Sequence, residues 1–253
     1  MIAGGSKLSH VAIFKAFCDE SYTHHASDKR IYSIAGFIGS PEAWAPFSER
    51  WMALLRPKGL THFHMTAYEN NSGPFENMPA DEAAALFNSL IDVIVDTDIY
   101  PFAASLEIEK WDELPDDAKE SGRNPYMVLL GMLIRRIPLD IHAPDGSHDV
   151  KVHFICEFPP EKGFVEECLR GFADTMESDD PCASRLLGLD FRGKMAHREF
   201  DAADIIAYAT MKQARKDLQG DPRIRYEIQR LLSRLPFIMM YTLNSFDVGP
   251  EVE

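Results

Sequence analysis

The sequence has no hydrophobic run long enough to cross a membrane. Its longest apolar stretch, residues 235–243, is about half as long as the roughly 18 residues that a membrane-spanning helix needs. The first ten residues also lack the charged and then apolar pattern of a secretory signal peptide. These absences predict a cytoplasmic protein with no membrane partner.

Cysteine is scarce, and several familiar enzyme motifs are missing. The chain has four cysteines and no C-x-x-C pair, which argues against a disulfide framework and against a zinc ribbon. It contains no P-loop, no glycine-rich dinucleotide motif and no Ser-His-Asp triad spacing. We therefore expect reduced thiols, and nothing here indicates a nucleotide-binding fold or a serine hydrolase.

Positive charge is also in short supply. Lys and Arg number 26 against 40 Asp and Glu, so the formal net charge is −14, and the mean field does not attract nucleic acid. The imbalance is uneven, because residues 76–120 carry 13 acids and two lysines, whereas residues 212–234 carry seven basic residues and three acids. Phosphate binding would need that basic segment or metal ions. The simpler interpretation of the basic segment is a solvated helix face with pairs such as Arg223 and Glu227.

What remains is the composition of a folded domain. The chain has 253 residues, of which 45% are hydrophobic and 26% charged, and this is enough for one large core. Apolar, partly β-branched runs predict strands at 11–18, 31–39, 99–108, 150–156 and 185–191. Apolar residues spaced by three and four predict helices within 41–96, after Pro125, after Gly163, from Asp201 to Leu218 and after Pro222.

The order of these elements predicts an α/β fold. Three strands come first and strands then alternate with helices, which favours a mixed sheet flanked by helices on both faces. We interpret residues 1–253 as a single domain. Residues 41–96 form a helical insertion after the second strand, and residues 221–253 form a helical C-terminal extension.

Three acidic residues occupy positions where catalytic groups collect. Asp19 follows the first strand, Glu157 follows the strand at 150–156, and Asp204 lies in the first turn of the helix that begins at Asp201. If the two strands are parallel neighbours, they lie roughly 4.8 Å apart, and their carboxyl ends share the sheet edge where α/β proteins bind ligands. The late helix could add Asp204 from a third direction.

Clustered carboxylates repel one another unless a cation neutralises them. Oxygen ligands suit Mg²⁺ or Mn²⁺ better than Zn²⁺. Two such ions roughly 3.5–4 Å apart can activate water and stabilise the leaving oxygen in phosphodiester hydrolysis. The acids therefore predict a divalent-metal-dependent phosphodiesterase or nuclease, with Asp19, Glu157 and Asp204 as metal ligands and catalytic residues.

These motifs resemble a known family. The Asp-Glu-Ser start at 19–21, Glu157 and the helix motif Phe200–Tyr208 together resemble the domain-of-unknown-function 3800 family, which is grouped with the ribonuclease H-like fold. The resemblance implies a ribonuclease H-like sheet, catalytic acids at Asp19, Glu157 and Asp204, and a nucleic acid substrate, either DNA or RNA. The chain departs from ribonuclease H in having Glu rather than Asp at 157, and no acid in the helix after Pro125 until Asp140.

Accessory roles are open for Glu20, Ser21, His24, His64 and Asp201. His24 or His64 could line the acid cluster and move protons, although an ordinary polar histidine in a loop is the simpler interpretation. Asp201 could be a ligand, but a helix cap is the better explanation for an acid at that position.

Two other functions are considered. A non-catalytic interaction module on the same fold would offer the acidic segment 76–120 to a basic protein partner and would be indifferent to magnesium or manganese. A zinc hydrolase would use His62 and His64, which are two residues apart, but it needs further ligands that the sequence does not place. Cys18 and Cys156 are expected to face away from the acids, as small core residues rather than nucleophiles.

Overall fold

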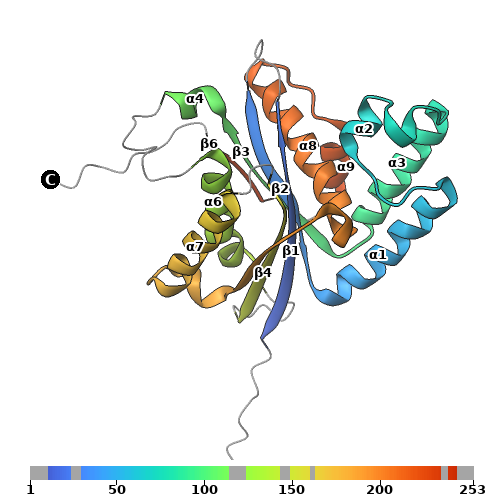
Figure 1. Ribbon diagram of the computed structural model, residues 1–253. Helices are drawn as coiled ribbons and strands as arrows, with labels where there is room; N and C mark the ends of the chain where they lie inside the picture. Colours follow the sequence, from blue (N-terminus) through green and yellow to red (C-terminus); the bar gives the residue numbers. More distant parts are fainter. Residues whose placement is uncertain are drawn as a thin grey trace, which may run out of the picture.

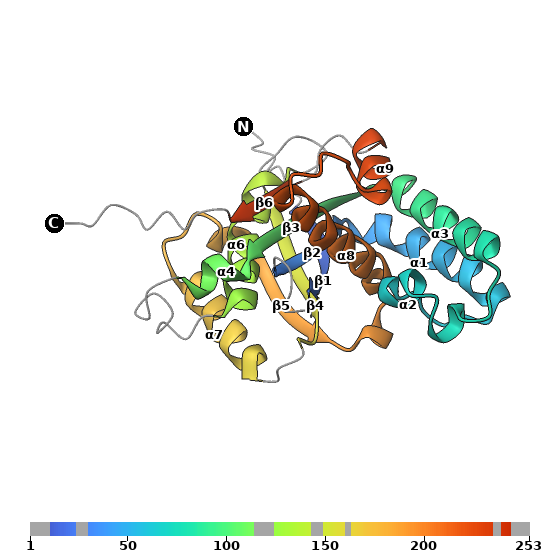
Figure 2. The same ribbon diagram turned by 90° about the horizontal axis from the view of Figure 1, so that it is seen from above.

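A central sheet separates two layers of helices in the computed structural model (Figures 1 and 2). The structure describes residues 11–23, 30–113, 124–142, 149–159, 163–234 and 239–243. The six strands are β1 (Ala12–Tyr22), β2 (Ile31–Gly39), β3 (Ile99–Glu107), β4 (Val150–Glu157), β5 (Leu186–Arg192) and β6 (Met239–Leu243). Together they form one sheet with the order β5-β4-β1-β2-β3-β6.

The strand directions confirm the predicted mixed sheet. β1 pairs with β2 and β2 with β3 in antiparallel fashion, whereas β1 and β4, β4 and β5, and β3 and β6 are parallel. The first five strands therefore have the order 3-2-1-4-5, which is the ribonuclease H-like order. The carboxyl ends of β1, β4 and β5 consequently meet at one edge of the sheet.

Helices cover both faces of this sheet (Figures 1 and 2). One face carries α1 (Pro41–Leu55), α2 (Met65–Glu69), α3 (Ala80–Val95), α8 (Glu199–Leu218) and α9 (Tyr226–Arg234). The other carries α4 (Ile108–Asp112), α6 (Pro125–Asp140) and α7 (Gly163–Glu177). The segment predicted as a helical insertion, 41–96, contains α1, α2 and α3.

Local sequence explains where the helices begin. Ser40 caps α1 by accepting a hydrogen bond from the N–H of Ala43, and Asn124 caps α6 by accepting one from the N–H of Met127. Each cap is followed by proline, whose fixed φ suits the first helical position. The insertion is tied to the sheet because the indole N–H of Trp44 donates to the carbonyl of Lys15 in β1.

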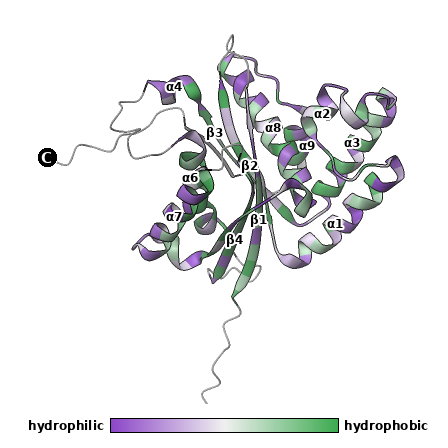
Figure 3. Cartoon of the chain, in the orientation of Figure 1, coloured by the Kyte–Doolittle hydropathy of each residue, from purple (hydrophilic) through white to green (hydrophobic). Residues whose placement is uncertain are grey.

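Two hydrophobic cores, one on each face, hold the layers together. Phe17, Trp51 and Phe200 belong to the core under α1, α3 and α8, whereas Cys18, Cys156 and Leu133 belong to the core under α6 and α7. Hydrophobic residues are concentrated in the sheet, as Figure 3 shows for β1 and β4. Residues 16–18 of β1 and 154–156 of β4 are buried on both faces, which accounts for the continuous apolar run at the centre of each strand.

Several predicted boundaries were wrong. β1 continues to Tyr22, so Asp19 lies within the strand rather than after it. The helical extension at 221–253 is only partly helical, because the chain after α9 returns to the sheet and residues 239–243 pair with β3 as β6. α8 begins at Glu199, two residues earlier than expected, so Asp204 lies in its second turn rather than its first.

The charged segments are more dispersed than the sequence suggested. The described part of the acidic segment 76–120 spans both sides of the sheet, with α3 on one face and α4 on the other (Figure 1). Several of its acids pair with basic residues elsewhere, such as Asp92 with Arg230 and Glu109 with Arg30. No helix among the described residues has the length and hydropathy required to span a membrane.

Candidate functional site

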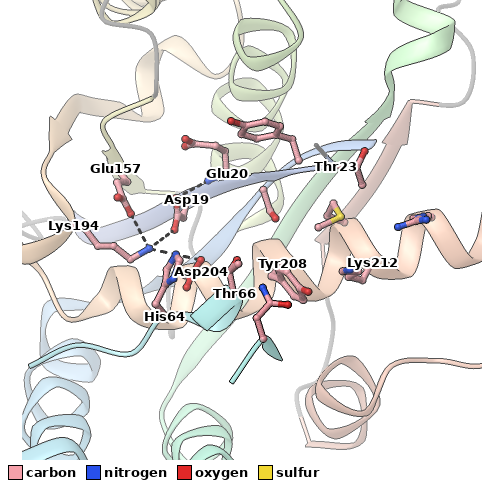
Figure 4. Close-up of a pocket in the computed structure, with 15 residues that line it drawn as sticks. Asp19, Glu20, Thr23, His64, Thr66, Glu157, Lys194, Asp204, Tyr208 and Lys212 are labelled. Carbon is pink, nitrogen blue, oxygen red and sulfur yellow. Dashed lines mark hydrogen bonds and ion pairs between the residues drawn. The ribbon is translucent and has the colours of Figure 1, made fainter. Parts of the chain in front are cut away.

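The three predicted acids meet around a single cation. Asp19 in β1, Glu157 at the end of β4 and Asp204 in α8 surround the side-chain ammonium of Lys194 (Figure 4). The Lys194 Nζ lies 3.4 Å from Asp19 Oδ2, 3.4 Å from Glu157 Oε2 and 3.7 Å from Asp204 Oδ1. The structure therefore brings together all three residues singled out by the sequence and adds a fourth that was missed.

The fold explains this convergence. β1 and β4 are parallel and paired in register, with Cys18 opposite Cys156, so the next residues, Asp19 and Glu157, emerge together on one face. Asp204 comes from α8, which packs directly on that face through Phe200 and Ile205. Cys18 and Cys156 belong to the core of the opposite face, as predicted.

Lys194 follows the third parallel strand, β5. It lies two residues beyond the end of β5, in a short 3₁₀ helix at Lys194–Ala196, so it leaves the sheet at the same edge as Glu157. The signal for it was present in the sequence, because a strand was predicted at 185–191 and polar residues just after a parallel strand face the ligand edge.

Burial and the mutual repulsion of the acids dominate the electrostatics of this cluster. Asp19 is 6% exposed, and burial raises its pKa well above the usual range, with Asp204 and Glu157 adding to the rise and Lys194 opposing it. Burial alone would lower the pKa of Lys194, but Asp19, Asp204 and Glu157 together raise it, so the ammonium is charged. Glu157 Oε2 is buried without a hydrogen bond. One positive charge thus faces three carboxylates, of which Asp19 and Asp204 are buried and Glu157 is partly buried, and the cluster can accept more positive charge.

The arrangement fits a divalent ion in its donor set. Carboxylate oxygens from three elements converge on one point, which is the ligand chemistry that Mg²⁺ and Mn²⁺ prefer. At present the lysine ammonium stands at that point. Among the described residues, no group of three His, Cys, Asp or Glu side chains is already set at metal-binding distances. An ion would therefore have to displace the Lys194 ammonium.

Asp201 is a positioning residue and not a helix cap. Arg198 holds the N-cap position of α8, whereas Asp201 is fully buried and its Oδ2 accepts hydrogen bonds from Trp51 Nε1 and the N–H of Phe63, each 2.9 Å long. Asp204 Oδ2 accepts a third, at 2.7 Å, from the N–H of Met65. The two aspartates thus hold the backbone on both sides of His64.

The residues predicted to have accessory roles lie in different places relative to the acid cluster. His64 and Ser21 line a groove beside the acids, and Figure 4 shows the His64 ring close to Asp204. The Glu20 side chain points away from Lys194 in the same view. Burial and, after it, the charge of Glu157 raise the pKa of Glu20 to about 8. His24 lies outside the described residues.

The pKa of Asp201 leads to a stability prediction. Burial raises this pKa to about 7, although the Phe63 and Trp51 N–H groups lower it in part. The folded state therefore holds the proton more tightly than the unfolded state, and the associated stability is lost as pH rises from about 4 to about 7. We expect Asp201→Asn, which keeps an oxygen acceptor, to remove a pH-dependent part of the unfolding free energy of up to about 4 kcal/mol.

Urea unfolding of wild type and Asp201→Asn at pH 5 and pH 8 measures this effect. The variant should gain stability relative to wild type between the two pH values. An unchanged difference would show that Asp201 is ionised in the folded protein at both.

The comparisons with protein families and curated proteins found no relative. No protein-family model matches the chain, and no curated protein shows significant similarity to it. Functional inference therefore proceeds from the geometry of the acid cluster.

Proposed function

We propose that the chain is a divalent-metal-dependent phosphodiester hydrolase that acts on nucleic acid. The observation that carries this proposal is the convergence of Asp19, Glu157 and Asp204 on one cation position at the carboxyl edge of a sheet with ribonuclease H-like strand order. No family model matches the chain, so the proposal rests on this geometry.

The acids would hold Mg²⁺ or Mn²⁺, as one ion or two, and the metal would supply positive charge that activates water and stabilises the leaving oxygen. The protein supplies the remaining functions. His64, held between two anchored N–H groups, lines the groove and would give a proton to the leaving oxygen. Lys194 lies at the same groove and can pair with an unesterified oxygen of the phosphate.

One observation favours a second candidate, a non-catalytic module on the same fold. Lys194 already gives the acids a counter-charge, so the cluster could be a structural ion-pair network that needs no metal. The two functions differ in their response to metal. A hydrolase gains stability and activity with Mn²⁺, whereas the module is indifferent to it.

Hydrolysis assays test the proposal. We expect wild-type protein to cleave bis(p-nitrophenyl) phosphate and fluorescein-labelled single-stranded DNA or RNA in Mn²⁺ or Mg²⁺, and to lose this activity in EDTA. Asp190→Asn is a matched control, because Asp190 lies in β5 but pairs with His153 and Arg192 outside the cluster. No cleavage of any substrate with either metal would favour the non-catalytic module.

A further inference from the structure

The groove that contains the acid cluster continues well beyond it. Its volume is about 630 Å³, within the usual range of about 300–1,000 Å³ for ligand pockets. α8 forms its floor, because Asp204, Tyr208, Lys212 and Arg215 recur at spacings of three and four residues and therefore share one face of the helix. Thr23 from the end of β1 and Thr66 from α2 line it as well (Figure 4).

Acidic and basic side chains lie at opposite ends of the groove along this helix. Acids occupy one end, and Lys212 and Arg215 line the other. Eight residues of helix separate Asp204 from Lys212, which corresponds to about 12 Å. That distance exceeds the spacing of neighbouring phosphates along a strand, so a phosphate at Lys212 would be a different one from the phosphate at the acids.

Lys212 is the residue at this end that has no anion. Its Nζ lies 5.2 Å from the centre of the Tyr208 ring, and the structure gives it no carboxylate within ion-pairing distance among the described residues. Burial lowers its pKa, and the like charges of Arg215 and Arg225 add to the decrease, whereas the charge of Glu69 opposes it. A phosphate placed here would relieve that repulsion.

Several other basic residues of the segment 212–234 already pair with acids. Arg223 pairs with Asp221, Arg230 with Asp92, and Arg225 with Glu69 and Glu227, so the expected pair of Arg223 with Glu227 is replaced by Arg225 with Glu227. Lys216, one turn beyond Lys212, lies outside the groove and 3.9 Å from Asp221. The positive end of the groove is therefore local and centred on Lys212.

Tyr208 does not act as a stacking platform for bases. It is 8% exposed, and the Lys212 ammonium and the Arg225 guanidinium lie within cation–π distance of its ring. Its position in the core instead fixes Lys212 over the groove. This end of the groove therefore offers a positive charge beside a largely buried ring.

We propose that the groove binds a short single-stranded segment of nucleic acid, with the reacting phosphodiester at the acids and a second phosphate of the same strand at Lys212. This inference rests on the proposed function for the first position. The second position rests on the charge and geometry of Lys212. A duplex is not the expected ligand, because the groove has the volume of a small-molecule pocket.

Fluorescence anisotropy with a labelled hexathymidylate tests this subsite. Ca²⁺ replaces Mn²⁺ in the assay, because it takes oxygen ligands in looser geometry and binding is the only readout. Lys212→Gln and Lys216→Gln form a matched pair, since each removes one positive charge from the same helix. Circular dichroism and thermal unfolding confirm that both variants fold.

We expect Lys212→Gln to weaken binding by about fivefold or more and to reduce the salt slope by about 0.7, the value for one phosphate contact in a single strand. Lys216→Gln should stay within about twofold of wild type. Equal effects of the two variants, equal affinity for a hexamer duplex, or no wild-type binding at about 0.1 mM would each overturn the subsite.

Failure of this inference and failure of the proposed function give different results. Suppose that wild type hydrolyses bis(p-nitrophenyl) phosphate but that hexamer binding is insensitive to Lys212→Gln. The proposed subsite would then be rejected, and the proposed hydrolase activity would stand. Hexamer binding that depends on Lys212, without any metal-dependent hydrolysis, would support a groove that binds nucleic acid and would reject the proposed hydrolase activity.

Discussion

Replacing Lys194 by Met should make the metal-free protein less stable and make its affinity for Mn²⁺ higher. The substitution removes the positive charge that lies among Asp19, Glu157 and Asp204, and it leaves Asp19 and Asp204 buried without this counter-ion. Removing one partner of a buried ion pair costs about 3–5 kcal/mol. For a chain of this size that corresponds to a fall in Tm of about 6–20 °C.

The same substitution should favour the metal. In wild type the ion competes with a tethered ammonium for the same oxygens, and the variant removes this competitor. We therefore expect Mn²⁺ to bind at least about tenfold more tightly and to raise the Tm by more in the variant than in wild type. Opposite changes in stability and metal affinity are the signature of a lysine that occupies a cation site.

Thermal unfolding in EDTA and across a Mn²⁺ titration measures both effects. Lys58→Met is a suitable control, because Lys58 pairs with Glu82 at the surface and such a pair contributes at most about 1 kcal/mol. If the Lys194→Met variant loses stability but does not respond to Mn²⁺, the cluster is a structural ion-pair network. A variant as stable as wild type would contradict the contacts drawn in Figure 4.

Asp19→Asn and Asp204→Asn should abolish hydrolysis without unfolding the protein. Each change removes one negative charge from the proposed ligand set, and we expect at least about a hundredfold loss of activity, on the order of what metal-site substitutions cost. The metal-free stability should be retained or improved, because each change also removes a charge that repels its neighbours. In Asp204→Asn, the amide oxygen of the new side chain can still accept the hydrogen bond from the N–H of Met65.

Paired assays of bis(p-nitrophenyl) phosphate hydrolysis and urea unfolding check this prediction, with Asp190→Asn as the control described above. Retained activity in either variant would exclude that aspartate from the reaction. A loss of activity that accompanied a loss of stability would instead make the residue structural.

Much of the fold could be predicted because the strands have strong local signals. The apolar runs at 31–39 and 150–156 became β2 and β4 with nearly the same bounds. The strand at the C-terminus was missed, because the five residues of β6 follow a helix and form a strand only by pairing with β3, which lies far away in the sequence. Such long-range pairing leaves no periodicity in a short apolar segment.

The acid cluster was predictable for a related reason. Asp19 and Glu157 each mark the end of a buried apolar run, and parallel strands bring such ends together. Lys194 could have been found by the same rule. The role of Asp201 could not, because its partners Trp51 and Phe63 come from an insertion whose packing against α8 is not encoded in any local pattern.

Calorimetric titration of Mn²⁺ into the purified protein tests the central claim most directly. The acid cluster as a metal site predicts saturable binding by wild type, tighter binding by Lys194→Met, and none by Asp19→Asn or Asp204→Asn with their folds intact. No binding by Lys194→Met, in which the competing ammonium is gone, would contradict the metal site, and binding unaffected by either aspartate substitution would place the ion elsewhere.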